Sequence, residues 1–176
     1  MSIDNKEQEK EQEKKKRVLI KVGSNVLSNT NNRIVLPVLR DLVRQMYLVK
    51  EAGFDVILVS SGAAIAGKEI IGNIDEKSPS IRRQIFSSVG QPRMMRHYYS
   101  IFSEYGLDCA QVLATKRDFS EGKHKENMIN CCEGLLRHGI IPIANEDDAV
   151  SLSMSMFTDN DELAGLVAHL VNADLM

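Results

Sequence analysis

The chain has 176 residues, of which 43% are hydrophobic and 26% are charged, and its formal net charge is −2. This length and composition are ordinary for one globular domain with a sizeable core. The small net charge offers no electrostatic attraction for nucleic acid or an anionic membrane, and no apolar run approaches the roughly 20 residues of a membrane-spanning helix.

Residues 4–16 consist of Asp, Asn, Glu, Gln and Lys. We therefore expect residues 1–16 to form a charged flexible tail and residues 17–176 to form the folded domain. Cys109, Cys131 and Cys132 are odd in number, have no CxxC spacing and follow no signal peptide. These features predict reduced thiols in a cytoplasmic protein.

The apolar run RVLIKV at 17–22 predicts a buried strand that turns at Gly23 and Ser24. Lys21 lies at the end of this strand, where its side chain either reaches the surface or points across the top of the sheet toward a phosphate. Residues 34–52 carry the apolar stripe of an amphipathic helix. With a second apolar run at 55–60, the order predicts a parallel β-α-β unit with a right-handed crossover.

The next segment, 62–68, fits the first seven positions of a P-loop, G-x-x-x-x-G-K. A P-loop needs Ser or Thr at the eighth position to hold magnesium, but this chain has Glu69, whose carboxylate would repel phosphates. We therefore reject the P-loop. What remains is a strand-to-helix turn of small residues whose backbone N–H groups face an anion.

Residues 80–105 have a helical pattern interrupted at 90–92, which predicts two helices or one kinked helix. A strand is predicted at 107–114 and a helix at 123–138. The four histidines are scattered without metal-ligand spacing, and we assign no metal ligands. The absence of G-x-G-x-x-G excludes the dinucleotide-binding motif.

The stretch from 140 to 161 carries the strongest functional signal. A short apolar strand at 140–144 breaks into the polar cluster 145–148, and a second cluster at 158–161 precedes a helix that Asp159 or Asn160 would cap. Ligands of open α/β sheets bind beyond the carboxyl ends of the strands. Two Asn/Asp clusters at one such end therefore predict a binding site. After this helix, 173–176 read as the approach to another strand.

In this order and spacing, these stretches resemble the amino acid kinase family, and within it the members that phosphorylate glutamate. The resemblance runs from Arg17 to the end of the chain. The motifs that carry it are VLIKVGS at 18–24 with VL at 26–27, VSSGA at 59–63 with Gly67, GQP at 90–92, IPI at 141–143 with Asn145, Glu146 and Asp148, DND at 159–161, and AD at 173–174.

The resemblance implies an αβα sandwich with a mainly parallel sheet. It also implies transfer of the γ-phosphoryl group of ATP, which brings Mg²⁺, to the side-chain carboxylate of L-glutamate. The product would be γ-glutamyl phosphate, the first intermediate toward proline. The family further implies L-proline as a feedback inhibitor, a homo-oligomer when the chain is complete, and a rear nucleotide-binding half that we expect this chain to lack.

By the family pattern, Lys21 contacts the transferring phosphate. Gly23 and Ser24 lie with it on the side of the nucleotide phosphates. Asp161 orients the catalytic lysines. Lys21 and Asp161 are therefore the predicted catalytic residues.

The same pattern places the glutamate site on two other strand ends. Ser61 and Gly62 would line the glutamate and phosphate side. Asn145 and Asp148 would hold glutamate, Asp148 through the ammonium group, and Asn160 would also contact the substrate.

The chain departs from the family at Asp147, where Asn is usual, and at Thr158, where Gly is usual. Two alternatives stay open: a sister kinase that acts on acetylglutamate or aspartate, and a non-catalytic amino-acid-binding module, which a missing rear half would favour. The acidic cluster suits a free ammonium better than an acetylated nitrogen.

Overall fold

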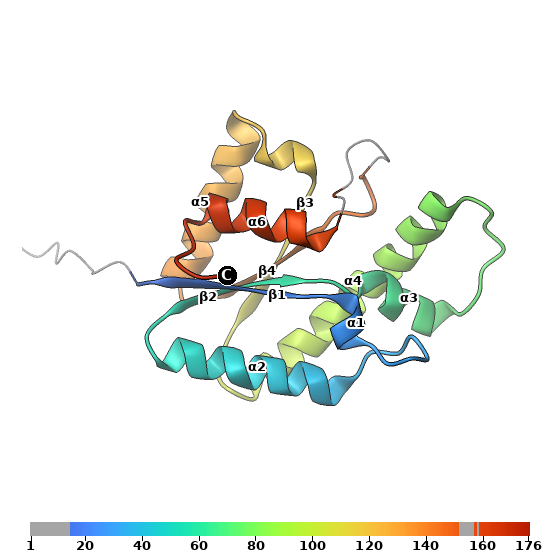
Figure 1. Cartoon of the computed structure of the whole chain (residues 1–176), viewed down its shortest axis with the longest axis horizontal. Helices are drawn as coiled ribbons and strands as arrows, with labels where there is room; N and C mark the ends of the chain where they lie inside the picture. The colour runs from blue at the N-terminus through green and yellow to red at the C-terminus, as the bar shows by residue number, and fades with distance from the viewer. Residues whose placement is uncertain (1–14, 152–156, 158) are drawn as a thin grey trace, which may run out of the picture.

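A computed structural model describes residues 15–151, 157 and 159–176, which form an α/β fold around one parallel sheet (Figure 1). The sheet has four strands in the order β1-β2-β4-β3. Their bounds are β1 Arg17–Val22, β2 Asp55–Ser60, β3 Cys109–Ala114 and β4 Ile141–Glu146. All three strand pairings are parallel. The predicted parallel pairing of the first two strands is therefore confirmed.

Helices cover both faces of this sheet, as predicted for an αβα sandwich. Figure 1 shows α2 and α4 on one face and α5 and α6 on the other. Their bounds, with those of the shorter elements, are α1 Ser24–Leu27, α2 Leu36–Glu51, α3 Ala63–Ile71, α4 Pro79–Ser103, η1 Lys116–Phe119, α5 Lys123–Arg137 and α6 Asn160–Leu170. Within the described ranges, no helix combines the length and apolar character needed to cross a bilayer.

The central strand β2 explains why both faces need helices. Val56 and Leu58 belong to the core formed with α2 and α4, whereas Ile57 and Val59 belong to the core formed with α5 and α6. Successive side chains of a strand point to opposite faces, so a continuous apolar run makes both faces of the strand apolar. Covering both faces leaves only the strand ends open to a ligand.

Three details of the structure bear on the sequence-based expectations: one extends a predicted strand, one decides between two alternatives, and one confirms a prediction. The strand expected at 140–144 continues through Asn145 and Glu146, because both residues pair with the end of β3. The segment around Pro92 does not separate two helices, since α4 runs continuously through it. The expected approach to a further strand is confirmed at Leu175, which forms a parallel bridge with Val18 on the side of β1 away from β2.

An ion pair made by a buried arginine ties the start of β1 to two distant segments. The side chain of Arg17 is almost fully buried, and its Nη1 and Nη2 atoms each donate to a carboxylate oxygen of Glu133 in α5 at 2.7 Å. Nη1 also donates to the carbonyl of Val171 at 2.6 Å, and the backbone N–H of Arg17 donates to Asp174 at 2.7 Å. β1, α5 and the segment after α6 therefore share one polar junction inside the fold.

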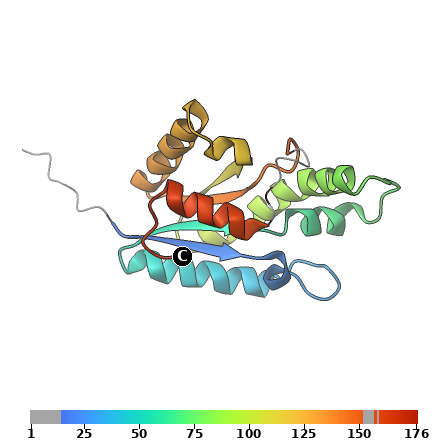
Figure 2. The same ribbon diagram turned by 45° about the horizontal axis from the view of Figure 1, so that its top comes forward.

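The hairpin of α3 and α4 projects past the carboxyl ends of the strands in both views (Figures 1 and 2). The two helices of this hairpin cross at two glycines, Gly67 of α3 and Gly90 of α4, each of which faces the backbone of the other helix. A Cβ atom at Gly67 would lie 1.8 Å from the carbonyl oxygen of Phe86, and one at Gly90 would lie 1.7 Å from that of Ala63. No heavy atom fits at such distances, so both positions require glycine. The contact fixes the first turn of α3 beside the strand ends.

Candidate active site

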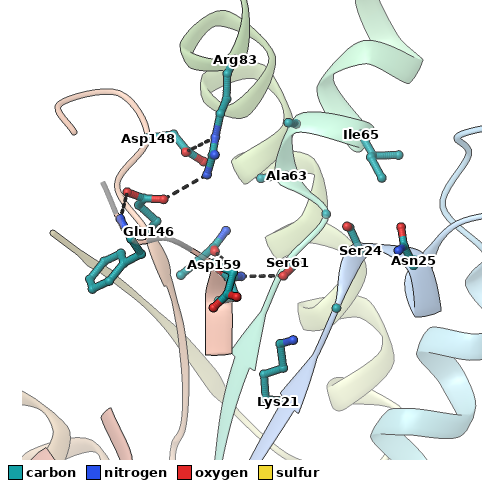
Figure 3. Close-up of a pocket in the computed structure, with 16 residues that line it drawn as sticks. Lys21, Ser24, Asn25, Ser61, Ala63, Ile65, Arg83, Glu146, Asp148 and Asp159 are labelled. Carbon is teal, nitrogen blue, oxygen red and sulfur yellow. Dashed lines mark hydrogen bonds and ion pairs between the residues drawn. The ribbon is translucent and has the colours of Figure 1, made fainter. Parts of the chain in front are cut away.

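An open cavity of about 530 Å³ lies at the carboxyl ends of β1, β2 and β4 (Figure 3). Of the site residues predicted from the sequence, eight line this cavity: Lys21, Gly23, Ser24, Ser61, Gly62, Asn145, Asp148 and Asn160. The ninth, Asp161, contacts the cavity through Lys21. The topology therefore brings together residues that are up to 140 positions apart in the sequence (161 − 21).

Lys21 provides positive charge at one end of the cavity. Its Nζ atom lies 2.5 Å from Oδ1 of Asp161, and the two side chains are 27% and 69% exposed. Gly23 follows closely, and a Cβ atom there would lie 3.7 Å from Lys21 Nζ. The ammonium is therefore held by a carboxylate that itself remains mostly in water.

The first turn of α3 lines the same cavity and supplies backbone donors. Gly62 caps the helix with φ of 102°, a left-handed conformation that favours glycine, and no side chain caps the turn. Ala63, Ala64 and Ile65 line the cavity. The first N–H groups of a helix have no partner within the helix, so this turn is suited to bind an anion.

The near P-loop does not form a phosphate loop in the structure. Its stretch from Ala63 onward is the helix α3 itself, and Lys68 lies exposed in the last turn. Lys68 is not among the residues that line the cavity. This geometry agrees with the sequence-based conclusion that the segment is not a P-loop, which rests on Glu69 at the position where a P-loop needs Ser or Thr.

The side-chain amide of Asn160 connects several of the residues that line the middle of the cavity. Its Nδ2 atom lies 2.5 Å from Oγ of Ser61, 3.3 Å from the carbonyl oxygen of Ser60 and 3.3 Å from Oδ1 of Asn145. Asp159 caps α6 by accepting from the backbone N–H groups of Asp161 and Glu162. One amide thus links the ends of β2, β4 and α6, which fixes the predicted binding residues relative to each other.

The far wall of the cavity is an ionic cluster that contains a residue the sequence did not reveal. Arg83 of α4 donates from Nε to Asp148 at 2.8 Å and from Nη2 to Glu146 at 3.0 Å. Figure 3 shows the guanidinium between these two carboxylates. Arg83 is one of two adjacent arginines in a polar helix start, and no spacing pattern separates it from Arg82. Only the tertiary fold brings it to the end of β4.

Glu146 is the most deeply buried carboxylate of this cluster, with a side chain that is 2% exposed. Burial raises its pKa, and the nearby charge of Asp148 raises it further. The backbone N–H of Phe157, which donates to Glu146 at 3.2 Å, and the guanidinium of Arg83 oppose this rise in pKa. Two carboxylates and one guanidinium leave the wall with a net charge of −1 when both acids are ionised.

The two departures from the family pattern have different outcomes. Asp147 does not line the main cavity; its backbone N–H donates to the carbonyl of Ala114 at 2.9 Å. Its side chain accepts from the N–H of Ala149 at 3.2 Å, as in a turn. Thr158 lies outside the described residues. Across the described part of the chain, no three His, Cys, Asp or Glu side chains form a group that could hold a metal ion.

The amino acid kinase family matches residues 16–176 of the chain. The chain is 41% identical over 160 residues to glutamate 5-kinase of Bacteroides thetaiotaomicron, covering 91% of this chain and 44% of that protein. It is 40% identical over 161 residues to glutamate 5-kinase 2 of Bacillus subtilis, covering 92% and 43%. The chain thus spans less than half the length of these relatives.

Solved structures support the fold independently of these sequence matches. Carbamate kinase of Giardia superposes with a TM-score of 0.62 at 14% identity, covering 92% of this chain and 74% of that one. UMP kinase of Ureaplasma parvum gives a TM-score of 0.58 at 11% identity, covering 92% and 68%. At such low identities the likeness concerns the fold alone.

Proposed function

Because the chain belongs to the amino acid kinase family, we propose that it carries the amino-acid side of a kinase that phosphorylates the side-chain carboxylate of L-glutamate. The single observation that carries the proposal is the charge arrangement of the cavity. A net negative wall at Asp148 and Glu146 lies across the cavity from Lys21, and the uncapped first turn of α3 lines the same cavity (Figure 3). An amino acid with an acidic side chain is complementary to this arrangement.

The proposed binding mode places each end of glutamate by charge. The ammonium group lies at the negative wall near Asp148, with Asn145 and Asn160 along the middle of the cavity. The side-chain carboxylate points toward Lys21, Ser61 and Gly62. The negative wall favours a free ammonium over an acetylated nitrogen, which supports glutamate over acetylglutamate as the substrate.

The reaction needs no general base. A glutamate side chain has a pKa of about 4.3, so the nucleophile is already ionised at neutral pH. One of its oxygens bonds to the γ-phosphorus of ATP while the bond from that phosphorus to the β–γ bridging oxygen breaks, giving γ-glutamyl phosphate and ADP. Attack by one anion on another is opposed by repulsion. Positioning and positive charge are therefore the main requirements, and Lys21 offers the charge.

Nucleotide phosphates fit the lysine end of the cavity because Lys21 supplies positive charge there and the N–H groups near Gly23, Ser24 and Gly62 are donors. Mg²⁺ in this proposal accompanies the phosphates of ATP, and no step is assigned to a metal held by the protein. By its product, the reaction would be the first step toward proline.

A chimera tests the proposal most directly. Residues 16–176 replace the matching part of the Bacteroides thetaiotaomicron relative, and acyl phosphate formed with ATP is trapped by hydroxylamine as the hydroxamate. We expect hydroxamate from glutamate and little from N-acetylglutamate or aspartate. The unmodified relative provides the positive control. A chimera that unfolds cooperatively but forms no hydroxamate from glutamate contradicts the proposal.

A further inference from the structure

The guanidinium of Arg83 is held by two carboxylates and, with respect to the described residues, has donors to spare. Its side chain is 46% exposed, whereas its partners Glu146 and Asp148 are only 2% and 8% exposed. Arg83 uses one N–H of Nε and one of Nη2 in these contacts. A guanidinium has five N–H donors, so three remain, and in the described part of the chain no hydrogen bond from Nη1 is recorded. Arg83 lines the cavity, and these donors are available to a ligand.

This wall presents both signs of charge side by side. A simple amine placed at Asp148 would meet the neighbouring guanidinium and be repelled. A simple carboxylate placed at Arg83 would meet two carboxylates and be repelled in turn. A group that carries an ammonium and a carboxylate on the same carbon satisfies both sides at once. That group is the α-carbon end of a free amino acid.

The rigidity of the wall favours such recognition. Glu146 is fixed from behind by the N–H of Phe157, and the two buried carboxylates orient the guanidinium before a ligand arrives. Arginine binds carboxylates through two parallel hydrogen bonds, so a preoriented guanidinium selects for planar geometry as well as for charge.

We infer that Arg83 binds the α-carboxylate of the substrate amino acid while Asp148 holds its ammonium, so that the two residues select an amino acid over an amine or a diacid. This inference rests on the proposed function, because it assumes that the α-carbon end faces this wall and that the side-chain carboxylate faces Lys21.

The test uses three ligands that differ by one group. Glutamate has both α-substituents, 4-aminobutyrate lacks the α-carboxylate, and glutarate lacks the ammonium. Binding of each to the 176-residue chain is measured by calorimetric titration for the unmodified protein, Arg83→Met, Arg83→Lys and Arg82→Met. Arg82 is the matched control, since it is adjacent in the same helix and does not line the cavity.

In Arg83→Met, the preference for glutamate over 4-aminobutyrate should fall by at least about tenfold, as expected for the loss of a charge-assisted hydrogen bond. The preference for glutamate over glutarate should fall much less, because Asp148 remains. Arg83→Lys keeps the positive charge without the two-pronged donor and should lose part of the preference. Arg82→Met should keep it in full.

Equal weakening of glutamate and 4-aminobutyrate in Arg83→Met would mean that Arg83 serves only as a counter-ion, and it would overturn the inference. If Arg83→Met does not unfold cooperatively, Arg83→Lys decides, and an unchanged preference overturns the inference. Failure of the unmodified chain to bind glutamate would refute the proposed function and this inference together. Glutamate binding with an unchanged preference would refute this inference alone.

Discussion

Lys21 and Asp161 form an ion pair whose main effect is positional. Because Asp161 is 69% exposed, water screens the pair, and exposed pairs typically stabilise a fold by only about 0–1 kcal/mol. The pair nevertheless restrains the lysine ammonium near the ends of β1 and α6. The expected consequence of removing either charge is therefore a loss of catalysis with little loss of stability.

Lys21→Met in the chimera should lower the turnover number by roughly 10²–10³, the usual effect of removing one preorganised charge-stabilising donor. Glutamate affinity should change much less, because the ammonium end of the substrate lies at the other wall. Hydroxamate formation and calorimetry measure the two effects. Lys68→Met, which removes an exposed lysine outside the cavity, is the control and should leave turnover unchanged. Normal turnover by Lys21→Met would remove Lys21 from the proposed mechanism.

Asp148→Asn should weaken glutamate binding by roughly 1.5–3 kcal/mol, the scale of a hydrogen bond that involves a charged group. The adjacent Asp147→Asn is the matched control, because Asp147 does not line the main cavity. It also restores the residue that the family pattern usually has. Calorimetric titration with glutamate compares the two variants. An Asp148→Asn protein that binds glutamate as tightly as the unmodified chain would exclude Asp148 from the site.

At the scale of elements, the position of α3 depends on its close contact with α4. The backbones meet at Gly67 and Gly90, and the first turn of α3 forms part of the cavity. Helix axes approach this closely only where a side chain is absent. The GQP motif at 90–92 therefore acts through Gly90 as a packing device that positions the proposed anion-binding turn.

Gly90→Ala should destabilise the protein by at least about 1–3 kcal/mol, because its Cβ would overlap the carbonyl of Ala63 and force the helices apart. Gly134→Ala in α5 is the matched control. Its Cβ meets no atom within 4 Å, so the higher helix propensity of alanine should stabilise by roughly 0.5–1 kcal/mol. Urea unfolding measures both changes. Equal stability of the two variants would contradict the close contact.

The elements were largely predictable from sequence because their periodicity is strong. Each predicted strand is present, and Asp159 caps α6 as one of the two expected candidates. The position at which β4 ends was not predictable. Asn145 and Glu146 are residue types that are common in loops, and their pairing with β3 keeps them extended. The two polar clusters indicated the position of the cavity, and the family resemblance supplied the individual residues predicted to line it. Arg83 carried no local signal, because its role depends on where α4 packs.

At the scale of the whole molecule, stability should depend on the protonation of Glu146. Burial raises its pKa above the ordinary value of 4.5, so between these two values the folded state holds a proton that the unfolded state has lost. Stability then falls as pH rises through this window. The contribution of the protonated carboxyl is fully present below about pH 4.5 and is lost as the pH passes the raised pKa.

Glu146→Gln removes this titration. We therefore compare the free energies of unfolding of the two proteins. The value for the unmodified protein minus the value for the variant should decrease as pH rises above 4.5. Taking the difference cancels the titration of those carboxylates that do not interact with Glu146, which the two proteins share. Urea unfolding from about pH 4 to about pH 8 measures the free energy of unfolding of both proteins. A difference that stays constant or increases with pH would contradict the buried, destabilised carboxylate.

The junction at Arg17 also has a consequence for the order of folding events. Its guanidinium contacts Glu133 and Val171, which are 116 and 154 positions away, and its backbone N–H contacts Asp174, 157 positions away. Contacts between such distant positions close large loops and slow folding. Until those partners arrive, burying the charged side chain is unfavourable. During synthesis, β1 therefore leaves the ribosome before the other described strands but is among the last to be locked in place.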